Sequence, residues 1–133
     1  MDACRRPLRC VVVEDDDAVR AVIALALRGF EVEARSFASA SDVAQACARV
    51  TPDVVFLDIA LPKFDAIDVI RALGSDGYRG AIALVSGHHS LLRAVQRIGE
   101  GSGLRMLEPV AKPFHASAIR RAAEDCARRT AAV

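Results

Sequence analysis

The sequence predicts an α/β fold in which five parallel strands form a sheet between two layers of helices. Two patterns predict it. Short apolar segments of strand length alternate five times with longer segments whose apolar residues recur at helical spacing. Several of the short segments are apolar on both faces, as is typical of parallel strands that helices cover on each side. Right-handed crossovers between such strands give a three-layer sandwich.

Capping and helix-breaking residues mark the first elements. The expected strands are residues 8–13, 30–37, 54–57, 81–85 and 104–110. The apolar faces of the helices that follow them span residues 19–27, 43–50, 67–73, 91–98 and 119–126. The acidic run 14–17 ends the first strand, and Asp16 or Asp17 caps the first helix. Ser39 or Ser41 opens the second helix, which a Thr-Pro pair ends.

Prolines and glycines mark the later boundaries. A loop through Pro62 leads into the third helix, which closes near Gly74. The fourth strand ends at Ser86, and the helix after it must finish before the Gly-Ser-Gly sequence at 101–103.

Two of the strands are expected at the edges of the sheet. Residues 30–37 alternate between apolar and polar side chains, and Pro109 in the last strand cannot donate a ladder hydrogen bond. These features match the flavodoxin-like order 2-1-3-4-5, with the first and third strands central. In that order, ligands bind in the crevice at the carboxyl ends of the first and third strands.

Length and composition indicate one domain over residues 1–133. The chain is 53% hydrophobic and 26% charged, which suits a single compact core. The net charge of +1 gives no long-range field for direct binding of nucleic acid or a membrane surface. No apolar run approaches the roughly 20 residues of a membrane helix, and the first residues lack the apolar core of a secretory signal. We therefore expect a cytoplasmic protein.

Four scattered cysteines agree with that location. They are Cys4, Cys10, Cys47 and Cys126. None forms a C-x-x-C pair or has a histidine at metal-site spacing, so neither a zinc site nor a disulfide framework is indicated. Reduced thiols are the simpler interpretation.

Polar side chains close four of the strands. Glu14 and Asp15 follow the first, Asp58 the third, Ser86 the fourth and Lys112 the fifth. Because carboxyl ends of parallel strands share one edge of the sheet, these side chains should converge on one cleft. Clustered carboxylates repel one another, and a hard cation or a neighbouring ammonium group is the ordinary way to keep them ionised.

Magnesium and Lys112 supply both kinds of positive charge. Mg²⁺ takes one or two protein carboxylates and keeps several waters, so a site of Asp15, Asp58 and the backbone carbonyl of Ala60 is expected. Asp58 can then act as a nucleophile toward phosphorus, with Lys112 and the Ser86 hydroxyl neutralising the phosphoryl oxygens.

Four segments resemble the signature segments of response-regulator receiver domains of two-component systems. They are VVVEDD, PDVVFLDIALP, ALVSGH and AKPF, in the family's order across nearly the whole chain. The resemblance implies Asp58 as phosphoacceptor, Glu14 and Asp15 as the acidic pair at the metal, Ser86 as the switch hydroxyl and Lys112 as the phosphoryl-binding lysine. It also implies a histidine kinase or phosphotransfer protein as donor and an output protein or domain downstream.

The sequence departs from this pattern at three positions. Lys63 and Ala66 stand where the family usually has glycines, which predicts a stiffer and more basic loop. Pro109 stands three residues before the lysine, where the family usually has Tyr or Phe, so the usual coupled aromatic switch cannot operate. The segment 86–114 is similar to receivers found ahead of EAL-type cyclic-di-GMP phosphodiesterase domains.

Two other functions remain open on the sequence alone. The missing aromatic favours a pseudo-receiver, a constitutive interaction module of the same fold. An aspartate-nucleophile phosphatase would need a D-x-D arrangement that Asp15 and Asp17 offer only nominally, and a cap for which the chain has no spare length. The switch hypothesis predicts that the helix from about Ser90 to Gly99 and the fifth strand move as the output surface. The oligomeric state, including a homodimer, is left open.

Overall fold

The computed structural model describes residues 7–132, and side chains as far as residue 127. Its strands are β1 (Arg9–Val13), β2 (Glu31–Arg35), β3 (Val54–Asp58), β4 (Ala81–Ser86), β5 (Arg105–Met106) and β6 (Val110–Ala111). Its helices are α1 (Asp17–Ala26), α2 (Ala40–Val50), α3 (Ala66–Ser75), α4 (His89–Gly101) and α5 (Ala116–Ala132). Within this part of the chain, no helix is long and apolar enough to cross a membrane.

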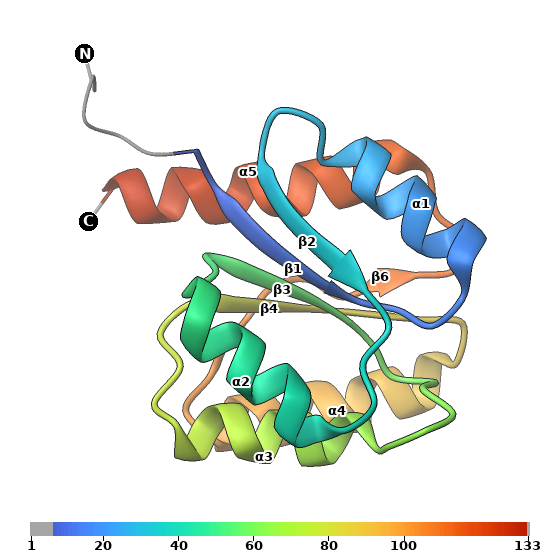
Figure 1. The fold of residues 1–133 in the computed structure, drawn as a ribbon, viewed down its shortest axis with the longest axis vertical. Coiled ribbons are helices and arrows are strands. Elements are labelled where there is room, and N and C mark those ends of the chain that lie inside the picture. The colour runs from blue at the N-terminus through green and yellow to red at the C-terminus, as the bar shows by residue number, and fades with distance from the viewer. Residues whose placement is uncertain (1–6, 133) are drawn as a thin grey trace.

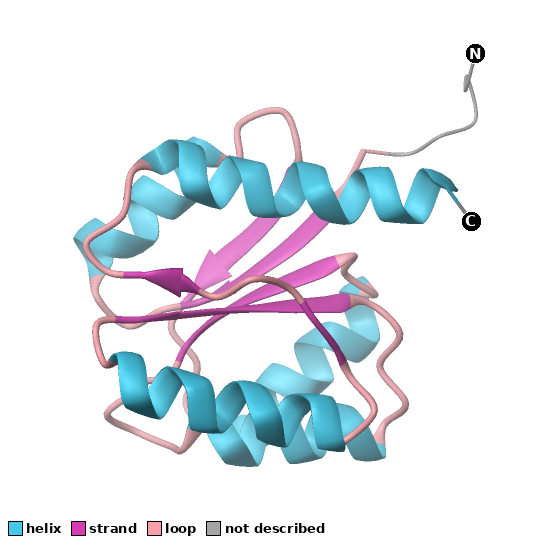
Figure 2. Ribbon diagram, turned by 180° about the vertical axis from the view of Figure 1, so that it is seen from behind, coloured by secondary structure: helices cyan, strands magenta, loops and turns pink. Residues whose placement is uncertain are grey.

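The strands form one parallel sheet between two helix layers. The order is β2-β1-β3-β4-β5, and β6 also pairs with β4, which confirms the predicted order and both predicted edges. Figure 1 shows α1 and α5 covering one face of the sheet and α2, α3 and α4 covering the other. Figure 2 gives the same layers from behind.

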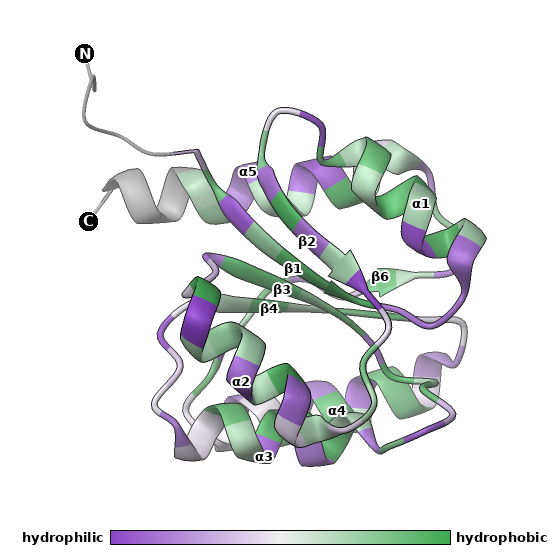
Figure 3. Ribbon diagram, in the orientation of Figure 1, coloured by the Kyte–Doolittle hydropathy of each residue, from purple (hydrophilic) through white to green (hydrophobic). Residues whose placement is uncertain are grey.

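Each face of the sheet has its own hydrophobic core. Side chains alternate between the faces along each strand, so Val11 and Val13 pack toward α2 and α3, whereas Cys10 and Val12 pack toward α1 and α5. Strands β3 and β4 are buried throughout, and Figure 3 shows them largely apolar. Burial on both faces holds the carboxyl ends of β1, β3 and β4 in fixed positions.

Side-chain caps start three of the helices. The Asp16 carboxylate accepts the Val19 N–H at 3.0 Å, and the Ser39 hydroxyl accepts the Asp42 N–H at 3.1 Å, which confirms both predicted caps. Asp65 caps α3 in the same way. By contrast, α4 begins after His88 without a side-chain cap. This helix also includes Gly101, which the sequence analysis placed beyond its end.

The prediction of one continuous strand at 104–110 was wrong. Residues of β5 pair with β4 at an offset of 24 positions (Ala81 with Arg105), whereas residues of β6 pair at an offset of 25 (Val85 with Val110). One extra residue therefore lies between β5 and β6, and residues 107–109 form a bulge. Pro109 accounts for part of the interruption because it has no N–H to donate to the ladder.

Three of the four cysteines lie within the described residues. Cys10, Cys47 and Cys126 are buried thiols outside any disulfide, and burial raises the pKa of Cys10 and of Cys47 to about 12. Thiols with so high a pKa are poor nucleophiles and poor metal ligands at neutral pH. Cys4 lies outside the described residues.

Candidate functional site

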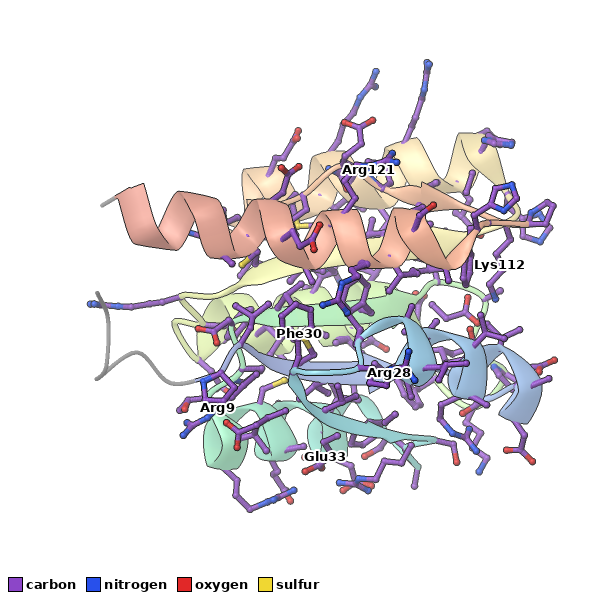
Figure 4. All side chains as sticks on the ribbon, turned by 90° about the horizontal axis from the view of Figure 1, so that it is seen from above. Arg9, Arg28, Phe30, Glu33, Lys112 and Arg121 are labelled. Atoms are coloured by element: carbon purple, nitrogen blue, oxygen red, sulfur yellow. The ribbon has the colours of Figure 1, made fainter. Side chains whose placement is uncertain are left out.

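The predicted site residues meet at the carboxyl edge of the sheet. Glu14 follows β1, Asp58 and Ser86 are the last residues of β3 and β4, and Lys112 follows β6. Glu14, Asp58 and Ser86 are almost completely buried, with exposed fractions of 2%, 5% and 0%. In Figure 4, Lys112 lies at the end of the sheet opposite Arg9, which begins β1. Four residues, of which Glu14 and Lys112 are 98 positions apart in the sequence, thus meet in one pocket.

Lys112 joins two of the carboxylates. Its ammonium Nζ lies 3.1 Å from Glu14 Oε1 and 3.3 Å from Asp58 Oδ2. Although burial by itself lowers the pKa of Lys112, the hydrogen bond to Glu14 and the charges of Asp58 and Glu14 outweigh it, so the pKa is raised. Lys112 is therefore a permanent cation of the pocket at neutral pH.

Glu14 is the most confined carboxylate of the site. Oε1 accepts from Lys112, and Oε2 accepts the Asp16 N–H at 3.1 Å. Burial raises the pKa of Glu14, and the Asp58 carboxylate raises it further, while the bonds from Asp16 and Lys112 act in the opposite direction. Both oxygens thus already have donors from the protein.

Asp58 is fixed by the strand that carries it. It pairs with Val85 in the register of β3 and β4, and its Oδ1 accepts the Ala60 N–H at 2.9 Å. The other oxygen, Oδ2, faces Lys112. Ala60 itself is exposed at the mouth of the pocket.

Ser86, the last residue of β4, is hydrogen-bonded to Lys112, which in turn contacts Asp58. Its buried Oγ accepts the His88 N–H at 3.0 Å, and its backbone carbonyl accepts the Lys112 N–H at 2.8 Å. A displacement of Ser86 would therefore reach Lys112 directly. His88 and His89, to which the sequence analysis assigned no role, are exposed.

The Asp15 carboxylate provides the test of whether a cation fits this pocket. Both of its oxygens are buried, and neither has a hydrogen-bond partner among the described residues. An ionised carboxylate is costly in that condition unless a cation compensates it. In the described part of the chain, no three His, Cys, Asp or Glu side chains could hold an ion by themselves. Mg²⁺ does not require three, because it commonly keeps waters and takes only one or two carboxylates.

One large cavity does not belong to this site. It has a volume of about 770 Å³ and lies at the amino edge of the sheet, lined by Asp53, Gly80 and Arg105 among others. A second cavity of about 440 Å³ adjoins the site, between the loop after Asp58 and the residues Leu91 and Val95 of α4. The predicted site residues therefore lie at the carboxyl ends of the strands and not in this cavity.

Arg20 is a positioning residue that was not predicted from the sequence. Arg20 on α1 donates to the Glu14 carbonyl at 2.8 Å and pairs with Asp17. It thereby holds the backbone of the acidic segment between β1 and α1. The i, i+3 spacing of Asp17 and Arg20 at the start of a helix was the available signal.

Known proteins resemble the chain in sequence and in fold. It is 32% identical to the response regulator MprA of Mycobacterium sp. (strain KMS), over 79% of this chain and 46% of that protein. It is 28% identical to the DNA-binding transcriptional regulator NtrC of Escherichia coli (strain K12), over 77% of this chain and 21% of that protein. The chain thus spans less than half the length of these relatives.

One solved structure and one family description complete the comparison. The fold matches the chemotaxis response regulator CheY4 of Vibrio cholerae with a TM-score of 0.71 and 18% identity, over 91% of this chain and 99% of that one. This likeness concerns the fold alone. The likeness to receivers ahead of EAL-type domains is not tested by these comparisons and stays a prediction. The family model of the response regulator receiver domain matches residues 10–124, which is most of the sequence. The chain therefore belongs to the family of response regulator receiver domains.

Proposed function

We propose that residues 1–133 are a single receiver domain that accepts a phosphoryl group on Asp58 and switches a partner protein or an output domain. One observation carries this proposal: Asp58 lies at the carboxyl edge of the sheet with Lys112 3.3 Å from one carboxylate oxygen and the Ala60 N–H on the other. The donor would be a histidine kinase or a phosphotransfer protein, and the protein would act in the cytoplasm.

The pocket suits in-line phosphoryl transfer. A carboxylate oxygen of Asp58 forms the new P–O bond while the bond from phosphorus to the donor breaks and its electron pair leaves with the donor. Such a reaction asks mainly for positioning and for neutralisation of the phosphoryl oxygens. Lys112 supplies a fixed positive charge, and the Ser86 hydroxyl can donate to one phosphoryl oxygen.

Mg²⁺ is the cofactor that the acidic groups fit. Asp15, Asp58 and the carbonyl of Ala60 would hold it directly, and Glu14 would support it through its negative charge or a bound water. The ion would neutralise charge that Lys112 leaves uncompensated, since three carboxylates share the pocket with one ammonium group. The unpartnered carboxylate of Asp15 supports this assignment.

Helix α1 offers a docking face for the donor. Ala18, Ala21, Val22 and Leu25 are exposed at the spacing of one helical stripe, and Leu25 is 65% exposed. The helix starts two residues after Asp15, so a protein bound there reaches the pocket.

Leu25→Glu should lower kcat/KM for transfer from a cognate kinase without changing labelling by acetyl phosphate. Gln45→Glu on α2 is a control, because Gln45 is also exposed on a helix and α2 covers the other face of the sheet.

Intact mass after incubation with Mg²⁺ and acetyl phosphate tests the proposed function. We expect wild type to gain one phosphoryl group and Asp58→Asn to gain none. Asp65→Asn is the matched control, because Asp65 is an exposed helix cap close in sequence and Asn caps a helix as well as Asp does. It should be labelled like wild type.

The alternative is a pseudo-receiver that binds its partner without phosphorylation. Pro109 favours it, because the strand lacks the aromatic residue on which the usual switch depends. If neither acetyl phosphate nor a panel of histidine kinases labels wild type, the pseudo-receiver becomes the better description. Hydrolysis of the phosphoryl group by the domain itself would be slow turnover of the same site. The oligomeric state, including a homodimer, stays open.

A further inference from the structure

The bulge at residues 107–109 lies directly behind the phosphorylation pocket. On its far side, Val110 and Ala111 pair with Val85 and Ser86, and the next residue is Lys112. Lys112 also donates its backbone N–H to the Ser86 carbonyl. Any change in how Ser86 and Lys112 sit in the pocket therefore acts on β6, and then on the bulge.

Gln96 of α4 is the side chain that meets this bulge. Its Nε2 donates to the Leu107 carbonyl at 2.9 Å. The other end of the amide, Oε1, is buried and has no hydrogen-bond partner within the described residues. The amide cannot simply be reversed, because Oε1 would then face the Leu107 oxygen, and neither atom can donate. Gln96 is thus bonded at one end and unsatisfied at the other.

The unsatisfied buried oxygen of the Gln96 amide favours a rearrangement that would give it a donor. An unmade buried hydrogen bond costs free energy, and a shift of the bulge that brings a backbone N–H toward Oε1 would remove the cost. Leu107 itself is held only partly by the sheet, since its N–H donates to the Ile82 carbonyl at 2.8 Å while its carbonyl bonds to α4. Gln96 and Leu107 therefore form a contact with two conceivable arrangements.

The rest of α4 is held unevenly. Its start has no side-chain cap at His88, and the cavity of about 440 Å³ separates Leu91 and Val95 from the loop after Asp58. Its end is packed closely, since a Cβ added to Gly99 would lie 2.5 Å from Met106 Sδ. Gln96 lies between the uncapped start and the closely packed end of α4, where a hydrogen bond can influence the position of the helix.

We propose that the Gln96–Leu107 hydrogen bond couples the phosphorylation pocket to α4. The inference rests on the proposed function, of which it names the internal regulation. When Ser86 and Lys112 turn toward a phosphoryl group on Asp58, β6 shifts, the bulge moves, and Gln96 releases the Leu107 carbonyl. The first turns of α4 then become free to move into the adjacent cavity. Gln96 is a positioning residue here, because it touches neither the phosphoryl group nor the metal.

The test compares Gln96→Met with Gln45→Met. Met has nearly the length of Gln and suits a helix, but it cannot donate to Leu107. Gln45 is the matched control, because it is an exposed glutamine on α2. In wild type and Gln45→Met, phosphorylation by acetyl phosphate should increase amide exchange in residues 89–97. In Gln96→Met that exchange should already be fast without phosphorylation, and the increase on phosphorylation should be lost.

A second measurement separates coupling from mere stability. Beryllofluoride with Mg²⁺ mimics the phosphoryl group without a covalent bond, so its affinity can be measured at equilibrium. Coupling between two sites is reciprocal, so releasing α4 should tighten beryllofluoride binding, by about fivefold in Gln96→Met. A side chain that only stabilises the fold would leave this affinity unchanged. Gln96→Glu, whose carboxylate also cannot donate to Leu107, repeats the test if Gln96→Met does not fold.

The outcomes separate the two proposals. If wild type is labelled on Asp58 and Gln96→Met matches Gln45→Met in exchange and affinity, the coupling is refuted and the phosphoacceptor function stands. If wild type is not labelled and does not bind beryllofluoride, the proposed function fails and the coupling fails with it.

Discussion

The two sides of β4 differ in regularity. On one side, β3 pairs with β4 over five consecutive residues, all of them buried. On the other, β5 and β6 each contribute a two-residue segment, and the register shifts by one residue between them. The regular side carries Asp58, and the interrupted side carries Lys112. The pocket thus combines a carboxylate fixed by a regular strand pair with a cation that follows an interrupted one.

Removing the cation should have the largest effect on this arrangement. Lys112→Met leaves Glu14 and Asp58 buried beside each other without their shared ammonium group. We expect a loss of about 3 kcal/mol in the free energy of unfolding, at the low end for a buried ion pair because 27% of the Lys112 side chain is exposed. Urea denaturation of the variant measures it. A loss near zero would mean that the carboxylates do not depend on Lys112.

Binding of Mg²⁺ should stabilise the folded protein, because the ion compensates the negative charge of the same carboxylates. An ion that binds only the folded state stabilises it by about 2.7 kcal/mol at 100 times its Kd. Wild type should therefore melt at a higher temperature in Mg²⁺ than in EDTA, and Asp15→Asn should lose most of that difference. Asp76→Asn, which changes an exposed aspartate at the end of α3, should retain it. Equal responses of the two variants would contradict a site at Asp15.

Amide exchange of the unphosphorylated protein compares the local stability of the two sides of β4 directly. Amides of Phe56 and Ala83 in the regular pair should exchange only through global unfolding. The Leu107 amide should exchange through local opening of the bulge, at a free energy about 2 kcal/mol lower. Native-state exchange at increasing urea concentrations distinguishes the two routes. The same protection on both sides would show that the bulge opens only with the whole sheet.

The smallest expected effect is the pH dependence that Glu14 contributes. Because burial and then Asp58 raise the pKa of Glu14 in the folded state, the folded protein binds this proton more tightly than the unfolded chain does. Glu14 should therefore lower stability as pH rises from its ordinary pKa of 4.5 through the raised folded pKa, by about 1.4 kcal/mol for each unit of difference. Glu14→Gln should lack this decline. A parallel pH profile of the two proteins would remove Glu14 as its source.

The regular side of the sheet is also the side that the sequence predicts well. Continuous apolar runs such as 54–57 give the buried strands, and the polar residues that end them give Asp58 and Ser86 their common edge. Local signals determine these features: burial on both faces, helix caps and the parallel direction of the strands. The family motifs add the roles of those residues, which remain proposals for this chain.

The interrupted side is predicted less well, because the apolar pattern of one segment does not reveal its register with the neighbouring strand. One signal was available. Leu107 and Val110 are both apolar but three positions apart, so a regular strand would direct them to opposite faces. In the structure both are buried in the same core. The hydrogen bonds of Gln96 and Arg20 to backbone carbonyls do not follow from an apolar pattern, because each depends on how a helix is placed against a carbonyl outside that helix.

The bulge also bears on how the domain avoids other copies of itself. An edge strand with a continuous row of free N–H and C=O groups is a template onto which another chain can add a strand, which leads to aggregation. Pairing along β5 and β6 would be broken by the register shift, and Pro109 supplies no N–H at that place. At the opposite edge, β2 presents the charged side chains of Glu31, Glu33 and Arg35. The proline that removes the usual aromatic residue thus also protects an otherwise open edge of the sheet.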